Sequence, residues 1–208
     1  MKVFVTGIGT GVGKTIVSAI LCEAFKADYW KPIQAGNLKD SDLMRVKKLV
    51  SNRQTVFHPE VYRLKLAASP HHAAAIENEK IELEKISLPK TSNHLIIEGA
   101  GGVLVPLNQN ELMIDMIDRM NLPVIIVSHH YLGSINHTLL SAEALRSRGL
   151  HILGIVFNGD ENKATEQVIL RMSKLKMLGR IKKERRINRK MIAGYAAKFR
   201  SSLNALFN

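Results

Sequence analysis

A glycine-rich loop between an apolar strand and a helix constrains the fold of this chain most. The segment "VTGIGTGVGKT" ends in Gly13-Lys14-Thr15 and overlaps the apolar run "KVFVT", which predicts a buried strand at residues 2–6. The residues after the loop predict a helix from Lys14 to Phe25. Glycines let the backbone approach an anion closely, and the N–H groups at the start of a helix attract negative charge. Strand, loop and helix together predict a phosphate-binding loop.

The spacing of this loop differs by one residue from the usual motif G-x-x-x-x-G-K-[ST]. That motif requires glycine at position 8, where Ile8 stands, and the glycine falls at Gly7 instead. The context is still that of a nucleotide site, in which Lys14 reaches the β- and γ-phosphates of ATP and the Thr15 hydroxyl holds Mg²⁺. The residues expected to surround the phosphates are Gly9, Gly11, Val12, Gly13, Lys14 and Thr15.

Apolar runs alternate with helical patterns along much of the chain. Further strands are expected at residues 28–32, 94–100, 123–128 and 152–158, and further helices at residues 41–50, 111–120 and 134–148. Strands that are apolar throughout and alternate with helices predict an α/β fold, with a doubly wound, mostly parallel sheet and helices on both faces, as in P-loop NTPases. No linker divides the chain, so residues 1–208 are expected to form one domain. Residues 51–89 show no clear period and are expected to be irregular.

Ligands of a doubly wound sheet bind beyond the carboxyl ends of its strands. Four segments should therefore share one edge: the glycine loop, "KPIQAG", "EGAGG" and "SHHYLGSINH". Lys31 would be a second cation beside Lys14, and phosphoryl transfer depends mainly on electrostatic stabilisation. Asp42 and Glu98 are candidate Mg²⁺ ligands, because Mg²⁺ favours a few carboxylates together with nucleotide phosphates. Asp42 also lies in the first turn of an expected helix, where it would stabilise the helix dipole.

Seven short motifs occur in an order that resembles one enzyme family. They are "TGIGTGVGKT", "WKPIQAG", "SDL", "ASPH", "EGAGGVLVPL", "LGSINHTLL" and "FN". Together they resemble the dethiobiotin synthetases, the ATP-dependent carboxylases of biotin synthesis. The resemblance covers about residues 1–159 and resumes at "LGRI". The loop of that family carries the same additional residue, typically Gly-Thr-Asp-Thr-x-x-Gly-Lys-Thr, and this accounts for the unusual spacing.

The resemblance implies a reaction and a set of site residues. Carbon dioxide would add to one amine of 7,8-diaminononanoate as a carbamate, ATP would phosphorylate the carbamate, and the second amine would close the ring of dethiobiotin with release of ADP and phosphate. By motif, the catalytic residues are Lys14, Lys31 and Thr10, the Mg²⁺ ligands are Thr15, Asp42 and Glu98, and Asn158 contacts adenine. The substrate-binding residues are Lys31, Ala35, Gly101, Gly133, Ser134 and Asn136.

The resemblance also implies a homodimer with its site at the interface. The segment "LGSINH" of one subunit would receive the far carboxylate of the substrate bound to the other subunit. Gly133, Ser134 and Ile135 open an expected helix whose N–H groups favour an anion. Ser134 is also a residue type that commonly caps helices, and it has this alternative role.

Three positions depart from the pattern of the family. Gly9 stands where an aspartate is common, and Gly11 stands where some members carry a glutamate. Ala35 stands where a serine or threonine hydroxyl is usual beside the diamine or carbamate. One lost hydrogen bond to a charged group costs roughly 1.5–3 kcal/mol, which predicts weaker substrate binding without loss of activity.

The net charge of +12 is concentrated near the end of the sequence. Residues 163–208 contain 13 Lys and Arg against 2 Asp and Glu, a net +11. Such a run can bind nucleic acid or an anionic membrane, but no aromatic residues interleave "RIKKERRINRK". We expect no nucleic-acid or membrane partner. The expected location is the cytoplasm, because the start of the sequence lacks signal-peptide features, no apolar run reaches roughly 20 residues, and Cys22 is the only cysteine.

Three alternatives remain at this point. A partition-type or septum-positioning P-loop ATPase would share the fold and would use the basic end to contact DNA or a membrane. That class typically carries an additional lysine early in the loop, where Gly9 stands. A related amidoligase of the corrin-ring type would need a glutaminase domain, for which we expect no room in 208 residues. The third alternative is an inactive relative of the synthetases, as Ala35 and the missing acidic residues suggest.

Overall fold

The structure is a computed structural model that describes residues 1–207. Seven strands pair in parallel in the order β4-β2-β6-β1-β7-β8-β9. Their bounds are Lys2–Gly7 (β1), Asp28–Trp30 (β2), Phe57–His58 (β4), Leu95–Gly102 (β6), Val124–His129 (β7), Ile152–Asn158 (β8) and Met177–Ile181 (β9). The predicted parallel sheet is confirmed.

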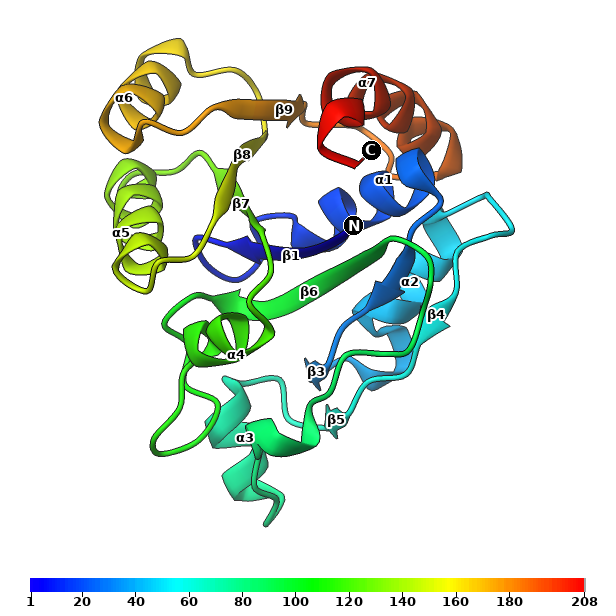
Figure 1. Cartoon of the computed structure of the whole chain (residues 1–208), viewed down its shortest axis with the longest axis vertical. Helices are drawn as coiled ribbons and strands as arrows, with labels where there is room; N and C mark the ends of the chain where they lie inside the picture. Colours follow the sequence, from blue (N-terminus) through cyan, green and yellow to red (C-terminus); the bar gives the residue numbers. More distant parts are fainter. Residues whose placement is uncertain (208) are drawn as a thin grey trace.

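The helices cover both faces of this sheet. They are α1 (Lys14–Phe25), α2 (Asp42–Leu49), α3 (Pro70–Ile76), α4 (Met113–Met120), α5 (Ser134–Ser147), α6 (Lys163–Ser173) and α7 (Arg189–Phe207). Figure 1 shows α1, α2 and α7 on one side of the sheet, and α4, α5 and α6 on the other. The chain therefore winds outward from β1 in both directions, as the alternating pattern predicted.

A second, two-stranded sheet was not predicted. It consists of β3 (Ile33–Ala35) and β5 (Tyr62–Leu64), which pair in parallel. Residues 51–89, which were expected to be irregular, contain β4, β5, the short helix α3 and the 3₁₀ turn η2 (Leu83–Lys85). Another 3₁₀ turn, η1 (Leu38–Asp40), leads into α2, and the Ser41 hydroxyl caps that helix by accepting from the Met44 N–H at 3.4 Å.

Strand β6 runs further than expected. The segment "EGAGG" was interpreted as a loop after the strand, but all of it belongs to β6. Gly102 pairs with Gly7 of β1, after a shift of register between Val5 and Gly7. The pairing with β1 holds this glycine-rich stretch extended, so that Glu98 sits inside the strand and not at its end.

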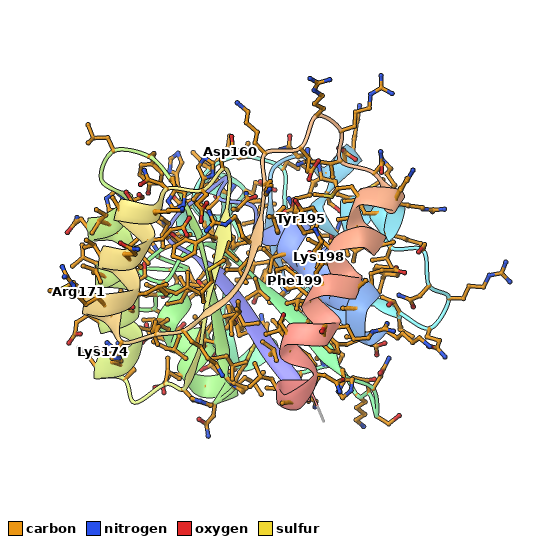
Figure 2. All side chains as sticks on the ribbon, turned by 90° about the horizontal axis from the view of Figure 1, so that it is seen from above. Asp160, Arg171, Lys174, Tyr195, Lys198 and Phe199 are labelled. Carbon is orange, nitrogen blue, oxygen red and sulfur yellow. The ribbon has the colours of Figure 1, made fainter. Side chains whose placement is uncertain are left out.

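The basic segment from residue 163 folds into α6, β9 and α7. The buried residues of α7 follow helical spacing and pack toward the sheet: Ile192, Tyr195, Ala196, Phe199, Leu203 and Phe207. Two arginines of this helix bind other elements, since Arg189 Nε donates to Lys48 O at 2.9 Å and Arg200 Nε donates to Ala24 O at 2.6 Å. Figure 2 places Arg171 on α6, Lys174 at the end of that helix and Lys198 on α7, so the basic charge is divided between separate helices.

One hydrophobic cluster extends from Val3 in β1 to Phe207 in α7 and includes side chains from both faces of the sheet. The strands of the sheet form the centre of this cluster. The apolar side chains of β1, β6 and β7 are almost entirely buried. Within residues 1–207, no helix combines the length and the apolar character that crossing a membrane requires.

Candidate functional site

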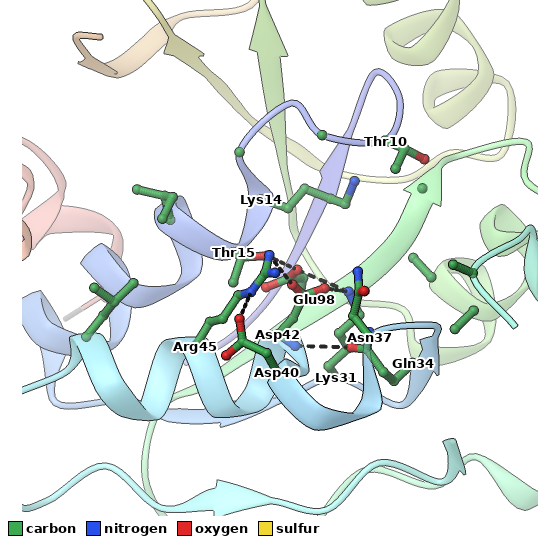
Figure 3. Close-up of a pocket in the computed structure, with 18 of the residues that line it drawn as sticks. Thr10, Lys14, Thr15, Lys31, Gln34, Asn37, Asp40, Asp42, Arg45 and Glu98 are labelled. Atoms are coloured by element: carbon green, nitrogen blue, oxygen red, sulfur yellow. Dashed lines mark hydrogen bonds and ion pairs between the residues drawn. The ribbon is translucent and has the colours of Figure 1, made fainter. Parts of the chain in front are cut away.

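A cavity of about 1200 Å³ opens where β1, β2 and β6 approach their carboxyl ends. One wall is the glycine loop with the start of α1, and another is α2 with the residues between β2 and η1. Figure 3 shows that side chains from these elements converge on its centre. The predicted site residues that line it are Thr10, Gly11, Gly13, Lys14, Thr15, Lys31, Ala35, Asp42, Glu98 and Gly101.

Lys31 lies between two carboxylates at the centre of this cavity. Its Nζ donates to Asp42 Oδ2 and, at 3.3 Å, to Glu98 Oε1, and the Lys31 and Glu98 side chains are almost fully buried. Thr15 Oγ1 donates to the same Glu98 oxygen at 2.8 Å. Burial alone would lower the pKa of Lys31, but the charges of Glu98 and Asp42 outweigh burial and raise that pKa above its ordinary value. Lys31 is therefore a cation in this setting.

Lys14 is a second buried cation in the same cavity. Its Nζ donates to Gly9 O at 2.8 Å, across the glycine loop. Its pKa is lowered to about 8, chiefly because burial disfavours the charged form; the negative charge of Glu98 opposes that effect and the positive charge of Lys31 adds to it. Two lysines thus face one space in which anionic phosphate and carbamate oxygens would gain strongly from their charge.

The glycine loop is fixed by Asn158 at the end of β8. Asn158 Nδ2 donates to Val12 O at 2.9 Å. Gly13 has φ of 100°, and a Cβ at that position would lie 2.2 Å from Asn158 Nδ2. A Cβ on Gly9, by contrast, would meet no atom within 4 Å. The loop therefore requires glycine at position 13 but has room for a side chain at position 9, where the synthetases that the sequence resembles often carry aspartate.

Gly13→Ala is expected to lower the free energy of unfolding by about 2 kcal/mol, because the left-handed φ and the contact with Asn158 both disfavour a Cβ. Displacement of Asn158 would also disturb the loop and weaken Mg·ATP binding about 10-fold. Denaturant unfolding and calorimetric titration with Mg·ATP measure the two effects. Gly9→Ala is the matched control and should change neither; equal effects of both substitutions would show that the Asn158 contact is unimportant.

Six predicted site residues lie outside the cavity lining. Gly9 and Val12 belong to the loop but do not line the cavity, and Asn158 Nδ2 donates to Val12 O. Gly133, Ser134 and Asn136 lie at the start of α5 and do not line the cavity of their own chain. The alternative role of Ser134 as helix cap is wrong, since Gly133 with φ of 102° occupies the cap position and Ser134 is the first, buried residue of α5.

Two residues that contact the predicted ligands were not found from the sequence. The Tyr29 hydroxyl donates to Glu98 Oε2 at 3.0 Å, and burial, reinforced by the charge of Glu98, raises the pKa of Tyr29 well above its ordinary value. Gln34 Oε1 accepts from the Asp42 N–H at 3.3 Å, while Gln34 Nε2 donates to Gly36 O at 2.8 Å. The period-two alternation of a strand was the available signal, because it places Tyr29 on the same side as Lys31.

The donor set suits Mg²⁺ bound together with a nucleotide. Thr15 offers a hydroxyl, and Asp42 and Glu98 offer carboxylates, all lining one space beside the glycine loop. Within residues 1–207, no group of three or more His, Cys, Asp or Glu side chains could hold a metal ion without further ligands. Mg²⁺ commonly takes one or two carboxylates, waters and substrate phosphates, so these residues fit an ion that phosphate oxygens help to hold.

Comparison with solved structures shows the fold. The cell division ATPase MinD of Pyrococcus furiosus superposes with a TM-score of 0.67, over 99% of both chains, at 14% sequence identity. A putative plasmid partition protein of Borrelia burgdorferi, solved with AMPPNP, superposes with a TM-score of 0.57 over 99% of this chain and 97% of its own, also at 14% identity. The fold is that of P-loop ATPases, and identities this low carry no further conclusion.

Sequence comparison shows the family. The model of a family described as an AAA domain matches residues 1–191. ATP-dependent dethiobiotin synthetases are 54% identical in Christiangramia forsetii (over 96% of this chain and 96% of the relative), 48% in Cytophaga hutchinsonii (95% and 96%) and 46% in Chlamydia pneumoniae (96% and 89%). This similarity extends over nearly the whole length of the chain. It therefore also covers most of the basic segment, of which the family motifs in the sequence had covered only "LGRI". This chain belongs to the ATP-dependent dethiobiotin synthetase family.

Proposed function

We propose that this protein catalyses the ATP-dependent closure of 7,8-diaminononanoate and carbon dioxide to dethiobiotin, with release of ADP and phosphate. The observation that carries the proposal is the convergence of Lys14 and Lys31 with Thr15, Asp42 and Glu98 in one cavity, in a member of this family. A site that brings two buried cations to a phosphate-binding loop suits transfer of phosphate to a second anion.

The chemistry proceeds in three balanced steps. One amine nitrogen attacks the carbon of CO₂ and loses a proton, which forms a carbamate. A carbamate oxygen then attacks the γ-phosphorus of ATP and ADP leaves, giving a carbamic-phosphoric anhydride. The second amine finally attacks the carbonyl carbon and loses a proton, while phosphate leaves with the former carbamate oxygen. The two lysines have a role in the second step, where two anions must approach each other.

Lys14 and Lys31 would stabilise different anionic groups during this transfer. Lys14 starts α1 beside the loop, so its ammonium group is suited to the β- and γ-phosphates. Lys31 lies deeper, next to Asp42 and Glu98, and is suited to the carbamate oxygens and the transferring phosphoryl group. Thr10, exposed on the loop and lining the cavity, would add a hydroxyl near the carbamate. The N–H groups of Gly9, Gly11, Val12 and Gly13 would surround the phosphates, and Asn158 would contact adenine.

Mg²⁺ would be held by Thr15, Asp42 and Glu98 together with nucleotide phosphates. When bound, it would neutralise negative charge that develops on the phosphate oxygens. Thr15 Oγ1 and Lys31 Nζ both contact Glu98 Oε1, which places the hydroxyl and the carboxylate oxygen on one side of the cavity. Gln34, through the Asp42 N–H, orients the start of α2 toward the same space.

The carbon chain of the diamine would lie against an apolar wall. Ala35, Ala68, Pro70, Ala100 and Val105 line the cavity. Ala35 provides a methyl group where most of the family provides a hydroxyl, so the amine or carbamate at this point relies on Lys31 and Thr10. The wall has no cation for the far carboxylate of the substrate among its lining residues between 67 and 105.

A second subunit would provide the site for that carboxylate. Gly133, Ser134 and Asn136 start α5 outside the cavity, and the neighbouring Leu132 is fully exposed, as an interface residue would be in an isolated chain. The N–H groups at the start of this 14-residue helix favour an anion. In a homodimer, each cavity would then take Lys14 from one subunit and Asn136 from the other.

Mixing of two variants tests this arrangement. Asn136→Asp should raise the KM for the diamine about 10-fold by placing a negative charge near the substrate carboxylate, while the exposed position in the first turn of α5 tolerates aspartate. Mixed with inactive Lys14→Ala under conditions that exchange subunits, it should gain activity at low diamine, because one site of each heterodimer has both residues intact. No gain, with exchange demonstrated by mass spectrometry, would contradict a shared site.

The reaction itself is tested by phosphate release from Mg·ATP with each component left out in turn. Release should require both 7,8-diaminononanoate and bicarbonate, and the mixture should contain dethiobiotin by mass spectrometry. Release that is indifferent to the diamine but stimulated by DNA or lipid vesicles would indicate an ATPase switch instead. No release under any condition would indicate an inactive relative.

A further inference from the structure

A fully buried tyrosine holds one oxygen of the central carboxylate. Tyr29 is 0% exposed, and its hydroxyl donates to Glu98 Oε2 at 3.0 Å inside the sheet. The ring of Phe57 on the neighbouring strand β4 is tilted against the Tyr29 ring, with 6.4 Å between the ring centroids. Neighbours on all sides therefore confine the phenol, and its hydroxyl is directed at a single charged group.

The two oxygens of Glu98 have different partners. Oε1 accepts from Thr15 Oγ1 at 2.8 Å and from Lys31 Nζ at 3.3 Å, so it belongs to the cavity. Oε2 accepts from Tyr29, which lies behind the carboxylate. The Glu98 side chain is almost fully buried, so its carboxylate depends on protein groups for its hydrogen bonds. The carboxylate is thus held from two sides, by Thr15 and Lys31 at the cavity and by the Tyr29 hydroxyl behind it.

Strand register explains why Tyr29 reaches this position. Parallel pairing places Tyr29 beside Ile96 and Trp30 beside Ile97. Lys31, directly after β2, therefore meets Glu98 of β6 at the cavity. Side chains alternate along an extended chain, which puts Tyr29 and the following Lys31 on one face of the sheet. Glu98 consequently contacts both residues of that face, Lys31 at the cavity and Tyr29 one step deeper.

We propose that Tyr29 is a positioning residue for the metal-binding oxygen of Glu98. The proposal rests on the proposed function in that Glu98 is taken as a ligand of the nucleotide-bound metal. By holding Oε2, the hydroxyl keeps Oε1 directed at the space shared with Thr15 and Asp42. Groups that hydrogen-bond to a metal ligand orient it, and their removal typically lowers metal affinity 10–100-fold. Tyr29 does not touch the substrate, and it acts only through Glu98.

Tyr29→Phe tests this role, with Tyr62→Phe as the matched control. Tyr62 is also buried and its hydroxyl is also bonded, but to the backbone N–H and carbonyl oxygen of Glu82, away from the cavity. Both substitutions remove one hydroxyl from a buried ring, so thermal unfolding should show stability losses of the same order. Binding of Mn²⁺ to the ADP complex, followed by electron paramagnetic resonance, measures metal affinity without turnover.

Tyr29→Phe should weaken Mn²⁺ binding about 10-fold, while Tyr62→Phe leaves it unchanged and ADP affinity in EDTA stays the same in both variants. Glu98→Gln should weaken Mn²⁺ binding at least as much as Tyr29→Phe. Unchanged Mn²⁺ affinity in folded Tyr29→Phe would overturn the proposal, as would equal losses in both tyrosine variants. Insensitivity of Mn²⁺ binding to Glu98→Gln would overturn it as well. Dethiobiotin formation by the unaltered protein tests the proposed function separately from these readings.

Discussion

Lys14→Ala is expected to lower turnover about 10³-fold, because the lysine supplies the charge nearest the transferred phosphate. Its Nζ is only hydrogen-bonded to Gly9 O, and none of the salt bridges within residues 1–207 includes it. Its removal therefore leaves no carboxylate without a partner, and burial already disfavours its charge, as the pKa of about 8 indicates. The variant should fold normally and fail in chemistry.

Rapid-quench measurement of phosphoryl transfer from Mg·ATP checks this prediction, with thermal unfolding as the check on folding. Lys39→Ala is a suitable control, since Lys39 is an exposed lysine in the turn η1, close to the cavity but outside its lining. The control should retain normal turnover and the variant should not. Near-normal turnover by Lys14→Ala would remove this lysine from the mechanism.

Lys31→Ala is expected to slow carbamate phosphorylation about 10²-fold while the affinity for ATP changes little. Lys31 lies beyond the phosphate loop and contacts Asp42 and Glu98, so its charge serves the acceptor side of the transfer. The substitution also removes the buried cation between two carboxylates, and breaking a buried ion pair typically costs about 3–5 kcal/mol. A clear loss of stability should accompany the loss of rate, in contrast to Lys14→Ala.

Single-turnover kinetics at saturating ATP separate the two properties of Lys31→Ala, and calorimetry measures ATP binding directly. Lys31→Met is a useful second variant, because it keeps most of the side-chain volume and removes only the charge. Both variants should show the same slow phosphorylation. A defect confined to ATP affinity would contradict the role given to Lys31, and so would a normal rate in Lys31→Met.

The glycine loop and its helix were the most predictable part of the molecule. The strand before the loop ends at Gly7, and the predicted helix has the observed bounds Lys14–Phe25. The meeting of Lys31 and Glu98 also followed from the rule that strand ends share one edge, whereas Asp42 was expected from its residue type and from the family resemblance. These features could be predicted because they depend on local sequence patterns and on one rule of sheet topology. They depend little on the twist of the sheet or on side-chain packing.

Other features depend on contacts between distant segments. Glycines 99, 101 and 102 suggested a loop, but pairing with β1 keeps them in β6. Three-residue strands such as β3 and β5 are too short to show a period and exist because they pair with each other. Helix α7 was not predicted, although its buried apolar residues follow helical spacing between the basic ones.

Several basic residues of the segment from residue 163 onward have structural roles. Arg189 and Arg200 bind backbone carbonyl oxygens of α2 and α1, and Arg180 pairs with Glu166 and, at 3.3 Å, with Glu161. Ile187, Asn188 and Arg189 also line one end of the cavity. These contacts attach the segment to the nucleotide side of the protein. Side-chain contacts across more than a hundred residues could not be inferred from charge alone.

The most direct test of the account follows the oxygen atoms of carbon dioxide. The protein is incubated with Mg·ATP, 7,8-diaminononanoate and ¹⁸O-labelled CO₂, quenched before the label exchanges with water, and both products are analysed by mass spectrometry. We expect one phosphate for each dethiobiotin, and a phosphate that carries one oxygen from CO₂, because the carbamate oxygen leaves with phosphorus. Unlabelled phosphate, or phosphate released without the diamine, would contradict it.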